Sequence, residues 1–110
     1  MKTLINRRWE LELPDFRATR PGWSWWEHEA LKILHAVIRP GDVVWDIGSE
    51  LGDLAALYAS WGARVVLVEP EPTMWPWIRW TFQANGLLAD ACVTGAVTRR
   101  DSPEIGRAHV

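Results

Sequence analysis

The sequence has almost no cysteine, which limits how the fold can be stabilised. Cys92 is the only cysteine among 110 residues, so no internal disulfide can form. Its neighbours in the sequence are apolar, and in such a run a cysteine usually packs as a small hydrophobic side chain. We therefore expect a buried thiol in a fold that is held together by its hydrophobic core.

Long apolar runs and an excess of basic charge are missing too. The first residues, MKTLINRRWELEL, lack the apolar region of a signal peptide, and no apolar run approaches the length of a membrane span. The net charge is -2, the pI is about 5.9, and the pairs Arg7-Arg8 and Arg99-Arg100 are too short to form a nucleic-acid-binding surface. We expect a cytoplasmic protein that binds neither a membrane nor nucleic acid.

Tryptophan, by contrast, is abundant. Exposed indole rings can stack on bases or sugars, whereas buried rings add a large apolar surface to a core. Several of these residues fall on the apolar faces of expected helices, so packing is the favoured interpretation. A non-catalytic tryptophan-rich binding module stays open as an alternative, and it would require Trp23, Trp25 and Trp26 to be coplanar and exposed. The nine tryptophans are Trp9, Trp23, Trp25, Trp26, Trp45, Trp61, Trp75, Trp77 and Trp80.

Residues 1–22 show little periodic pattern. The segment WELELP favours a short strand that Pro14 ends. A helix is expected from Ser24, which is a suitable N-cap residue, to about Val37, because apolar residues recur there with helical spacing. The turn Pro40-Gly41-Asp42 follows this helix.

Beyond residue 42, apolar runs alternate with helical patterns. That order predicts an α/β fold with a parallel sheet and right-handed crossovers within one small domain. Asn85-Gly86 is a signal for a left-handed helix end. The expected elements are a buried strand at 43–48, an amphipathic helix at 54–61, a buried strand at 64–69, a helix at 73–84 and a strand at 91–97.

The segment DIGSELGD, residues 46–53, lies between the first strand of this sheet and the helix that follows. Ligands of open α/β sheets bind at the carboxyl ends of the strands, which is where this loop would lie. Glu69 ends the second strand, and an acidic residue at that position can accept two hydrogen bonds from a ribose diol. Together, the loop and Glu69 predict a nucleoside site.

The charge of the loop discriminates between nucleoside ligands. A dinucleotide loop, G-x-G-x-x-G, needs glycine at position 50, where this chain has Glu50. Its carboxylate would repel a pyrophosphate, and Asp46 and Asp53 add more negative charge. S-adenosylmethionine carries a sulfonium and an ammonium group instead of phosphates, so an acidic loop suits it better. The NAD-binding half of an oxidoreductase stays open as the alternative.

The stretch from Pro40 to Val97 resembles the start of a class I S-adenosylmethionine-dependent methyltransferase, and the FkbM-type family in particular. Glu50 departs from this family, in which asparagine or glycine is common at that position. The matching motifs are D-x-G-x-x-x-G at Asp46, Gly48 and Gly52, V-x-x-x-E-P ending at Glu69 and Pro70, and N-G-L at Asn85, Gly86 and Leu87.

The resemblance implies a Rossmann-like parallel sheet and methyl transfer from S-adenosylmethionine to a hydroxyl group. It identifies neither the catalytic residues nor the methyl acceptor. A purely structural role for the loop is the competing interpretation, in which the glycines make a tight turn and Asp46 caps the next helix. By resemblance, Asp46 lies near the methionine end, Gly48, Ser49, Glu50 and Gly52 bring the backbone close to the cofactor, Glu69 holds the ribose, and Pro70, Gly95 and Ala96 line the adenine.

Two histidines stand seven residues apart on the expected helix at 24–37. His28 and His35 lack a third ligand at a suitable spacing, so a metal site is not expected. A general base at Glu27 or His28 is conceivable, because a helix that precedes the first strand can flank the site. The favoured interpretation is a solvated polar face of an amphipathic helix.

The family that this chain resembles has a seven-stranded sheet in the order 3-2-1-4-5-7-6, whereas the pattern here supplies about three strands. We therefore expect a truncated sheet, with the strand at 43–47 exposed as an apolar edge. The expected division is an N-terminal segment with its flanking helix at 1–39, a partial cofactor-binding domain at 40–100 and a tail at 101–110.

The last residues, EIGRAHV, correspond to the codons GAG-ATC-GGA-AGA-GCA-CAC-GTC. From its second base this string matches the start of a common sequencing adapter, whose next codon in this frame is the stop TGA. We therefore expect residues 105–110 to be an artefact of sequencing. The competing interpretation is a genuine short tail, with Pro103 as a break before a charged end.

Overall fold

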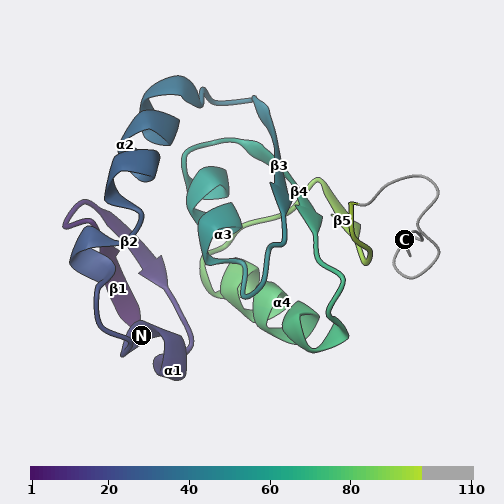
Figure 1. The fold of residues 1–110 in the computed structure, drawn as a ribbon, viewed down its shortest axis with the longest axis horizontal. Helices are drawn as coiled ribbons and strands as arrows, with labels where there is room; N and C mark the ends of the chain where they lie inside the picture. Colours follow the sequence, from purple (N-terminus) through teal and green to yellow (C-terminus); the bar gives the residue numbers. More distant parts are fainter. Residues whose placement is uncertain (98–110) are drawn as a thin grey trace.

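The computed structural model describes residues 1–97, so the expected tail at 101–110, with its suspected artefact at 105–110, lies outside the described residues (Figure 1). None of the helices within 1–97 is both long and apolar enough to cross a membrane. In chain order the elements are β1 (Lys2–Ile5), β2 (Trp9–Glu12), α1 (Asp15–Ala18), the 3-10 turn η1 (Trp23–Trp25), α2 (His28–Val37), β3 (Val43–Ile47), α3 (Asp53–Ser60), β4 (Arg64–Val68), η2 (Pro72–Met74), α4 (Trp75–Ala84) and β5 (Ala91–Val93).

A three-stranded parallel sheet forms the second half of the described chain, as predicted. Its strand order is β3-β4-β5, so β4 is central and the other two strands form the edges. The register pairs Trp45 with Val66 and Leu67 with Cys92. Since α3 joins β3 to β4 and α4 joins β4 to β5, the mixed α/β architecture is confirmed.

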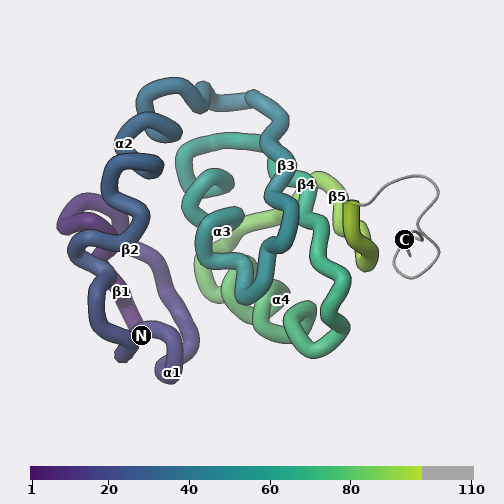
Figure 2. The backbone as a smooth tube through the Cα atoms, in the orientation of Figure 1, coloured from purple at the N-terminus to yellow at the C-terminus, as the bar shows by residue number. Residues whose placement is uncertain are grey.

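Helix α3 lies between this sheet and the N-terminal part of the chain (Figures 1 and 2). It contacts β2 on one side and β3 and β4 on the other. Ala55, Ala56 and Leu57 are fully buried, and Tyr58 is nearly so. The expected amphipathic helix is thus buried on two sides. Its small alanine side chains let the N-terminal hairpin approach on one side and the parallel sheet on the other.

The N-terminal residues are more regular than expected. They form an antiparallel hairpin of β1 and β2, in which Leu4 pairs with Glu10, and a short helix, α1. The strand expected in WELELP is confirmed as β2, whereas β1 was missed. The hairpin turn has no glycine, and Asn6 and Arg7 take up the positive φ angles of 52° and 58° that the turn requires. Tight hairpin turns are usually recognised in a sequence by a glycine, and this turn contains none, so the hairpin could not be predicted.

Two helices begin later than expected. Ser24 lies in the η1 turn and does not cap α2, since Glu27 adopts a left-handed conformation (φ 47°) that interrupts the helical path before His28. The helix expected from Thr73 likewise begins with the η2 turn, and α4 starts at Trp75 with Pro76 in its first turn. The short turn η1 packs beside β1, so tertiary packing overrides the helical pattern of the sequence at this point.

The tryptophans divide between the core and the surface. Trp23 is buried, and its ring meets Trp26 edge-on at 73°, so the coplanar exposed surface that a binding module needs is not formed. Trp9, Trp26, Trp61 and Trp75 pack against the core, whereas Trp25, Trp45, Trp77 and Trp80 are exposed.

One face of β3 is largely exposed, whereas Val68 of β4, which pairs with Ile47, is buried. Val43, Trp45 and Ile47 point away from α3 and are 53%, 61% and 55% exposed. The expectation of a buried strand is therefore wrong for β3 and right for β4, where Val65 and Leu67 are buried. The reason is that α3 and α4 supply cover for one face only, while β3 forms the apolar edge that was predicted.

Cys92 is exposed, so the expectation of a buried thiol is wrong. It lies on β5, which is a short edge strand of three residues, and it pairs with the buried Leu67 of the central strand. The apolar neighbours of Cys92 in the sequence indicated burial, but the position of β5 at the edge of the sheet decides its exposure.

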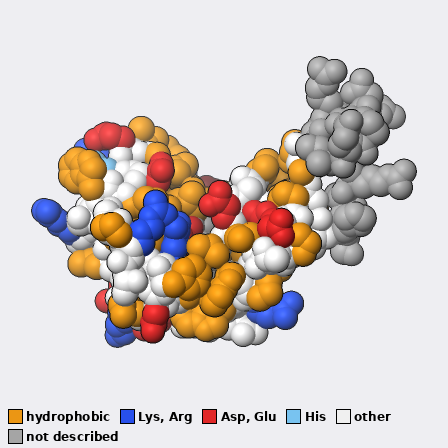
Figure 3. Space-filling view, turned by 60° about the horizontal axis from the view of Figure 1, so that its bottom comes forward, with side chains coloured by type: hydrophobic (Ala, Val, Ile, Leu, Met, Phe, Trp, Pro, Cys, Tyr) orange, Lys and Arg blue, Asp and Glu red, His pale blue; other side chains and the backbone are white. Residues whose placement is uncertain are grey.

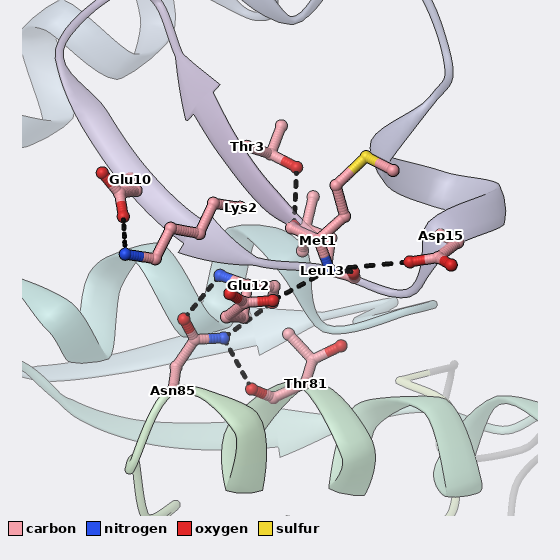
Figure 4. A network of polar contacts seen from close by, with 9 residues as sticks. All are labelled: Met1, Lys2, Thr3, Glu10, Glu12, Leu13, Asp15, Thr81 and Asn85. Atoms are coloured by element: carbon pink, nitrogen blue, oxygen red, sulfur yellow. Dashed lines mark hydrogen bonds and ion pairs between the residues drawn. The ribbon is translucent and has the colours of Figure 1, made fainter.

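Asn85 joins the end of α4 to the hairpin (Figure 4). Its Oδ1 accepts a hydrogen bond from the Glu12 N–H (2.8 Å), and its Nδ2 donates to the carbonyl oxygens of Glu12 (2.8 Å) and Thr81 (2.7 Å). The side-chain amide thus takes the place of a neighbouring strand beside β2. Gly86, with φ 65°, provides the predicted left-handed end of the helix.

We predict that Asn85→Ala lowers the free energy of unfolding by about 2–3 kcal/mol, since each lost hydrogen bond contributes about 1 kcal/mol. Urea denaturation followed by tryptophan fluorescence measures the change. The matched control is Gln83→Ala, an exposed position on the same helix, which should shift stability by no more than about 0.5 kcal/mol. Equal transition midpoints for Asn85→Ala and Gln83→Ala would contradict the role assigned to Asn85.

Candidate functional site

The loop after β3 folds over the end of β4. The N–H groups of Gly48 and Ser49 both donate to the Val68 carbonyl oxygen, at 2.8 and 3.1 Å. The Ser49 hydroxyl donates to the Asp46 carbonyl oxygen at 2.8 Å, and this side chain is buried. The predicted site residues of the loop are therefore brought together at the carboxyl ends of two adjacent strands.

Gly52 has a packing role that does not depend on a ligand. Its φ is 82°, and a Cβ atom added there would lie 3.3 Å from the Cα of Ile78 on α4. A larger residue would push the start of α3 away from α4. Gly48 also has a positive φ, of 76°, but a Cβ atom there would meet no atom within 4 Å, so its surroundings leave space for a ligand.

Glu69 connects the loops that follow β3 and β4. Its side chain is buried, and its Oε1 accepts the Glu50 N–H at 2.7 Å while its Oε2 accepts the Glu71 N–H at 2.8 Å. The start of α4 is tied to the same point, since the Trp75 Nε1 donates to the Glu69 carbonyl oxygen at 3.1 Å. A carboxylate oxygen can accept a second hydrogen bond, so a ribose would have to use this remaining capacity.

Glu50 adopts a left-handed conformation, with φ 51°. The left-handed region of backbone conformation costs a residue with a Cβ atom about 1–2 kcal/mol. This cost is a physical reason why glycine or asparagine is common at this position in the family that the chain resembles. The conformation directs the Glu50 N–H toward Glu69. The backbone of Glu50 therefore organises the loop, while its exposed side chain adds negative charge.

Asp46 has a buried oxygen without a partner. Among the described residues, no hydrogen bond reaches its Oδ2 atom. Burial raises the pKa of this carboxyl above its ordinary value, the nearby Ser49 hydroxyl acts to lower it, and the negative charges of Asp53, Glu50 and Glu69 act to raise it further. Burial also raises the pKa of Tyr58 to about 12, with the charges of Asp46 and Glu27 as smaller causes.

Arg17 neutralises one acidic residue of the loop. Its Nε and Nη2 atoms both lie 2.6 Å from the Oδ2 of Asp53, and the two side chains are only 14% and 7% exposed. The guanidinium also lies over the ring of Trp23, with 5.2 Å between the Cζ atom and the ring centroid. Asp53 is thereby held in a structural ion pair between α1 and α3, whereas no described lysine or arginine pairs with Asp46.

A cavity of about 480 Å³ opens beside Glu69. In it, Phe16 of α1 meets Trp77 of α4 edge-on, with 4.8 Å between the ring centroids. Figure 3 shows acidic side chains gathered near the middle of one face of the molecule, beside a broad apolar patch. Among the described residues, no lysine or arginine lines the cavity. Its lining residues are Phe16, Glu50, Leu51, Glu69, Glu71, Met74 and Trp77.

The predicted site is assembled only in part. Asp46, Gly48, Ser49, Glu50, Gly52 and Glu69 come together, but of these only Glu50 and Glu69 line the cavity beside Glu69. Pro70 lines a different cavity, and Ala96 lines neither of the two. Phe16 and Arg17 were not predicted as site residues, since both lie in the segment whose sequence shows little periodic pattern. Glu71, Met74 and Trp77 were not predicted either, although the acidic repeat in EPEP was a usable signal for Glu71.

The two histidines of α2 serve packing. His28 stacks on Trp25 with ring centroids 3.8 Å apart, and its Nδ1 atom is buried without a hydrogen bond. His35 contacts the rings of Trp9 and Trp61. Both histidines are half-buried by these ring contacts, whereas Glu27, Glu29 and Lys32 are exposed, so the expected solvated polar face is formed only in part. Within residues 1–97, no group of three histidine, cysteine, aspartate or glutamate side chains is placed to hold a metal ion.

No model of a known protein family matches this chain, and no curated protein does so either. The likeness to FkbM-type methyltransferases therefore rests on the quoted sequence motifs alone.

We predict that Glu50→Gly stabilises the protein by about 1 kcal/mol, because glycine adopts a positive φ without strain. The control is Glu50→Ala, which removes the same charge but keeps the strained conformation. Chemical denaturation of both variants separates the two causes. An equal gain from Glu50→Ala would show that charge, and not backbone strain, sets the cost of Glu50.

The raised pKa of Asp46 gives a second prediction. A carboxyl with a raised folded-state pKa favours folding while it is protonated, and that contribution is lost as the pH rises through the folded-state pKa. Asp46→Asn should therefore raise the melting temperature at about pH 7 and lose this advantage below about pH 4. Thermal melts across this range provide the test.

The matched control is Asp90→Asn at the opposite end of the sheet, where Asp90 makes an exposed ion pair with Arg64 at 2.7 Å. This variant should not raise the melting temperature at neutral pH. A pH-independent gain for Asp46→Asn would contradict the assignment.

Proposed function

We propose that the chain binds S-adenosylmethionine at the carboxyl ends of β3 and β4, as part of a methyltransferase that acts on a hydroxyl group. The observation that carries this proposal is the charge of the site. Within residues 1–97, carboxylates line its cavity without any lysine or arginine, and the nearby Arg17 is already paired with Asp53. Such a site disfavours a pyrophosphate and favours a ligand with a positive charge.

The residues present fit this cofactor. Glu50, Glu69 and Glu71 line the cavity, and their carboxylates favour a cationic ligand there. Asp46 lies behind this lining with its Oδ2 buried, and the positive charge of a ligand in the cavity would offset part of the energetic cost of the buried carboxylate. The rings of Phe16 and Trp77 add aromatic faces near the acidic side chains, and aromatic faces attract cations. The open space around Gly48 lets the ligand approach the backbone.

Glu69 has a double role in this proposal. Its carboxylate holds the two loops through backbone N–H groups, and each oxygen keeps one acceptor position for a ribose hydroxyl. Pro70 and Ala96 do not line the acidic cavity, so adenine contacts at these two residues stay a hypothesis from resemblance alone.

When bound, S-adenosylmethionine supplies a methyl group that is activated by its sulfonium. The residues of this chain would bind and orient the cofactor, which is how such enzymes achieve much of their rate. No described side chain is assigned as a catalytic base, and the acceptor is specified only as a hydroxyl compound.

We predict that S-adenosylmethionine binds more tightly than NAD, because Glu50 and Asp46 repel the pyrophosphate of NAD. Isothermal titration calorimetry with the two ligands provides the test. Asp46→Asn should weaken S-adenosylmethionine binding, whereas Asp90→Asn should leave it unchanged. Tighter binding of NAD would refute the cofactor assignment in favour of an oxidoreductase half.

The same titration tests Glu69. We expect Glu69→Ala to weaken S-adenosylmethionine binding by about 1.5–3 kcal/mol, the range for a hydrogen bond to a charged group. Glu10→Ala is the matched control, because the Glu10 carboxylate lies on β2, outside the lining of the cavity, in an exposed ion pair with Lys2 at 3.4 Å. Circular dichroism must show that each variant is folded. An unchanged dissociation constant for a folded Glu69→Ala would exclude the ribose contact.

A further inference from the structure

A second and larger cavity lies between α4 and the strands β4 and β5. Its volume is about 900 Å³, which is within the range of sites for small organic ligands. Leu67, Ile78 and Phe82 line it and are almost completely buried, whereas Leu88 lines it and is 90% exposed. The cavity is therefore an apolar groove that is accessible from solvent.

The groove exists because β5 carries small side chains. Cys92 lies beside Leu67 in the register of the sheet, on the face that α4 covers. Ala89, just before β5, is small as well, so α4 meets bulky side chains over β4 and a gap over β5. Trp75, Ile78 and Phe82 form one apolar stripe of α4, at helical spacing, along this gap.

Two polar side chains of α4 line the same groove. Arg79 and Gln83 are four residues apart, so they project from the same side of the helix. Arg79 has no ion-pair partner among the described residues, and no aspartate or glutamate lines the groove. This charge pattern is the reverse of that in the cavity beside Glu69, where carboxylates stand without a cation.

We infer that this groove binds an amphiphilic carboxylic acid. The hydrocarbon part lies against Leu67 and Phe82, and the carboxylate pairs with the guanidinium of Arg79 and accepts a hydrogen bond from the Gln83 amide. Guanidinium and carboxylate match each other in charge and in bidentate geometry. The inference does not depend on the proposed function, since it uses neither the loop after β3 nor Glu69.

Cys92 provides a local readout. It is the only thiol in the chain, it lines the groove, and it is exposed. Burial raises the pKa of this thiol, and the charge of Arg79 partly opposes the shift, which is consistent with Arg79 facing the same space. A ligand in the groove should shield Cys92 from alkylation by iodoacetamide.

The experiment measures the rate of Cys92 alkylation as decanoate or decanol is added below its micelle concentration. We expect saturable protection by decanoate and much weaker protection by decanol, which lacks the charge. Arg79→Met should weaken decanoate binding by about tenfold or more, as for the loss of a charge-assisted hydrogen bond, without changing the binding of decanol. Alkylation rates are compared with and without ligand within each variant, because the charge of Arg79 also lowers the pKa of the Cys92 thiol and so changes its rate of alkylation.

Two further variants make the result specific. Gln83→Glu places a carboxylate in the groove and should abolish protection by decanoate, while Arg7→Met, in the hairpin turn, should preserve it. Equal protection by decanoate and decanol would overturn the inference, and so would protection that is unaffected by Arg79→Met in a folded variant. Shielding of Cys92 that grows with protein concentration in the absence of ligand would assign the groove to a second copy of the chain instead.

Discussion

Helix α3 packs against the N-terminal hairpin on one side and against the parallel sheet on the other, through one short run of small and apolar side chains. Ala55, Ala56 and Leu57 have no exposed surface at all. Because a close-packed interior transmits small displacements, the position of α3 fixes both neighbouring layers. Its first residue, Asp53, is bound to Arg17 of the N-terminal unit, so the same packing also holds the loop that precedes the helix.

The sequence predicted those parts of the fold that local pattern controls. The alternation of apolar and helical segments identified β3, α3, β4, α4 and β5, and the positions of Gly48, Gly52 and Glu69 identified the loop and the strand end that meet in space. The β1 strand was missed, since its turn at Asn6 and Arg7 takes an unusual conformation without glycine. Contacts between distant segments, such as that of Phe16 with Trp77, leave no trace in local spacing.

The acidic end of the sheet shows a conflict between stability and proposed binding. Glu50 has an unfavourable backbone conformation, and Asp46 has a buried oxygen that no described group satisfies. Strained and unsatisfied groups persist where the surrounding structure holds them in place, and they are frequent at functional sites. Here the surrounding structure is the Glu69 carboxylate with its two backbone N–H groups, so the residue that organises the loops also concentrates negative charge beside Asp46.

The contact between Asn85 and Glu12 spans 73 residues of sequence, and this separation has a consequence for synthesis on the ribosome. A lone two-stranded hairpin is only marginally stable in water. The partners that keep β2 in place, α3 and Asn85, are translated long after it. Until the end of α4 has left the exit tunnel, β1 and β2 therefore lack these packing partners in the nascent chain, and the side chains of Trp9 and Leu11 are exposed to solvent. Apolar segments exposed in this way are of the general kind that chaperones bind.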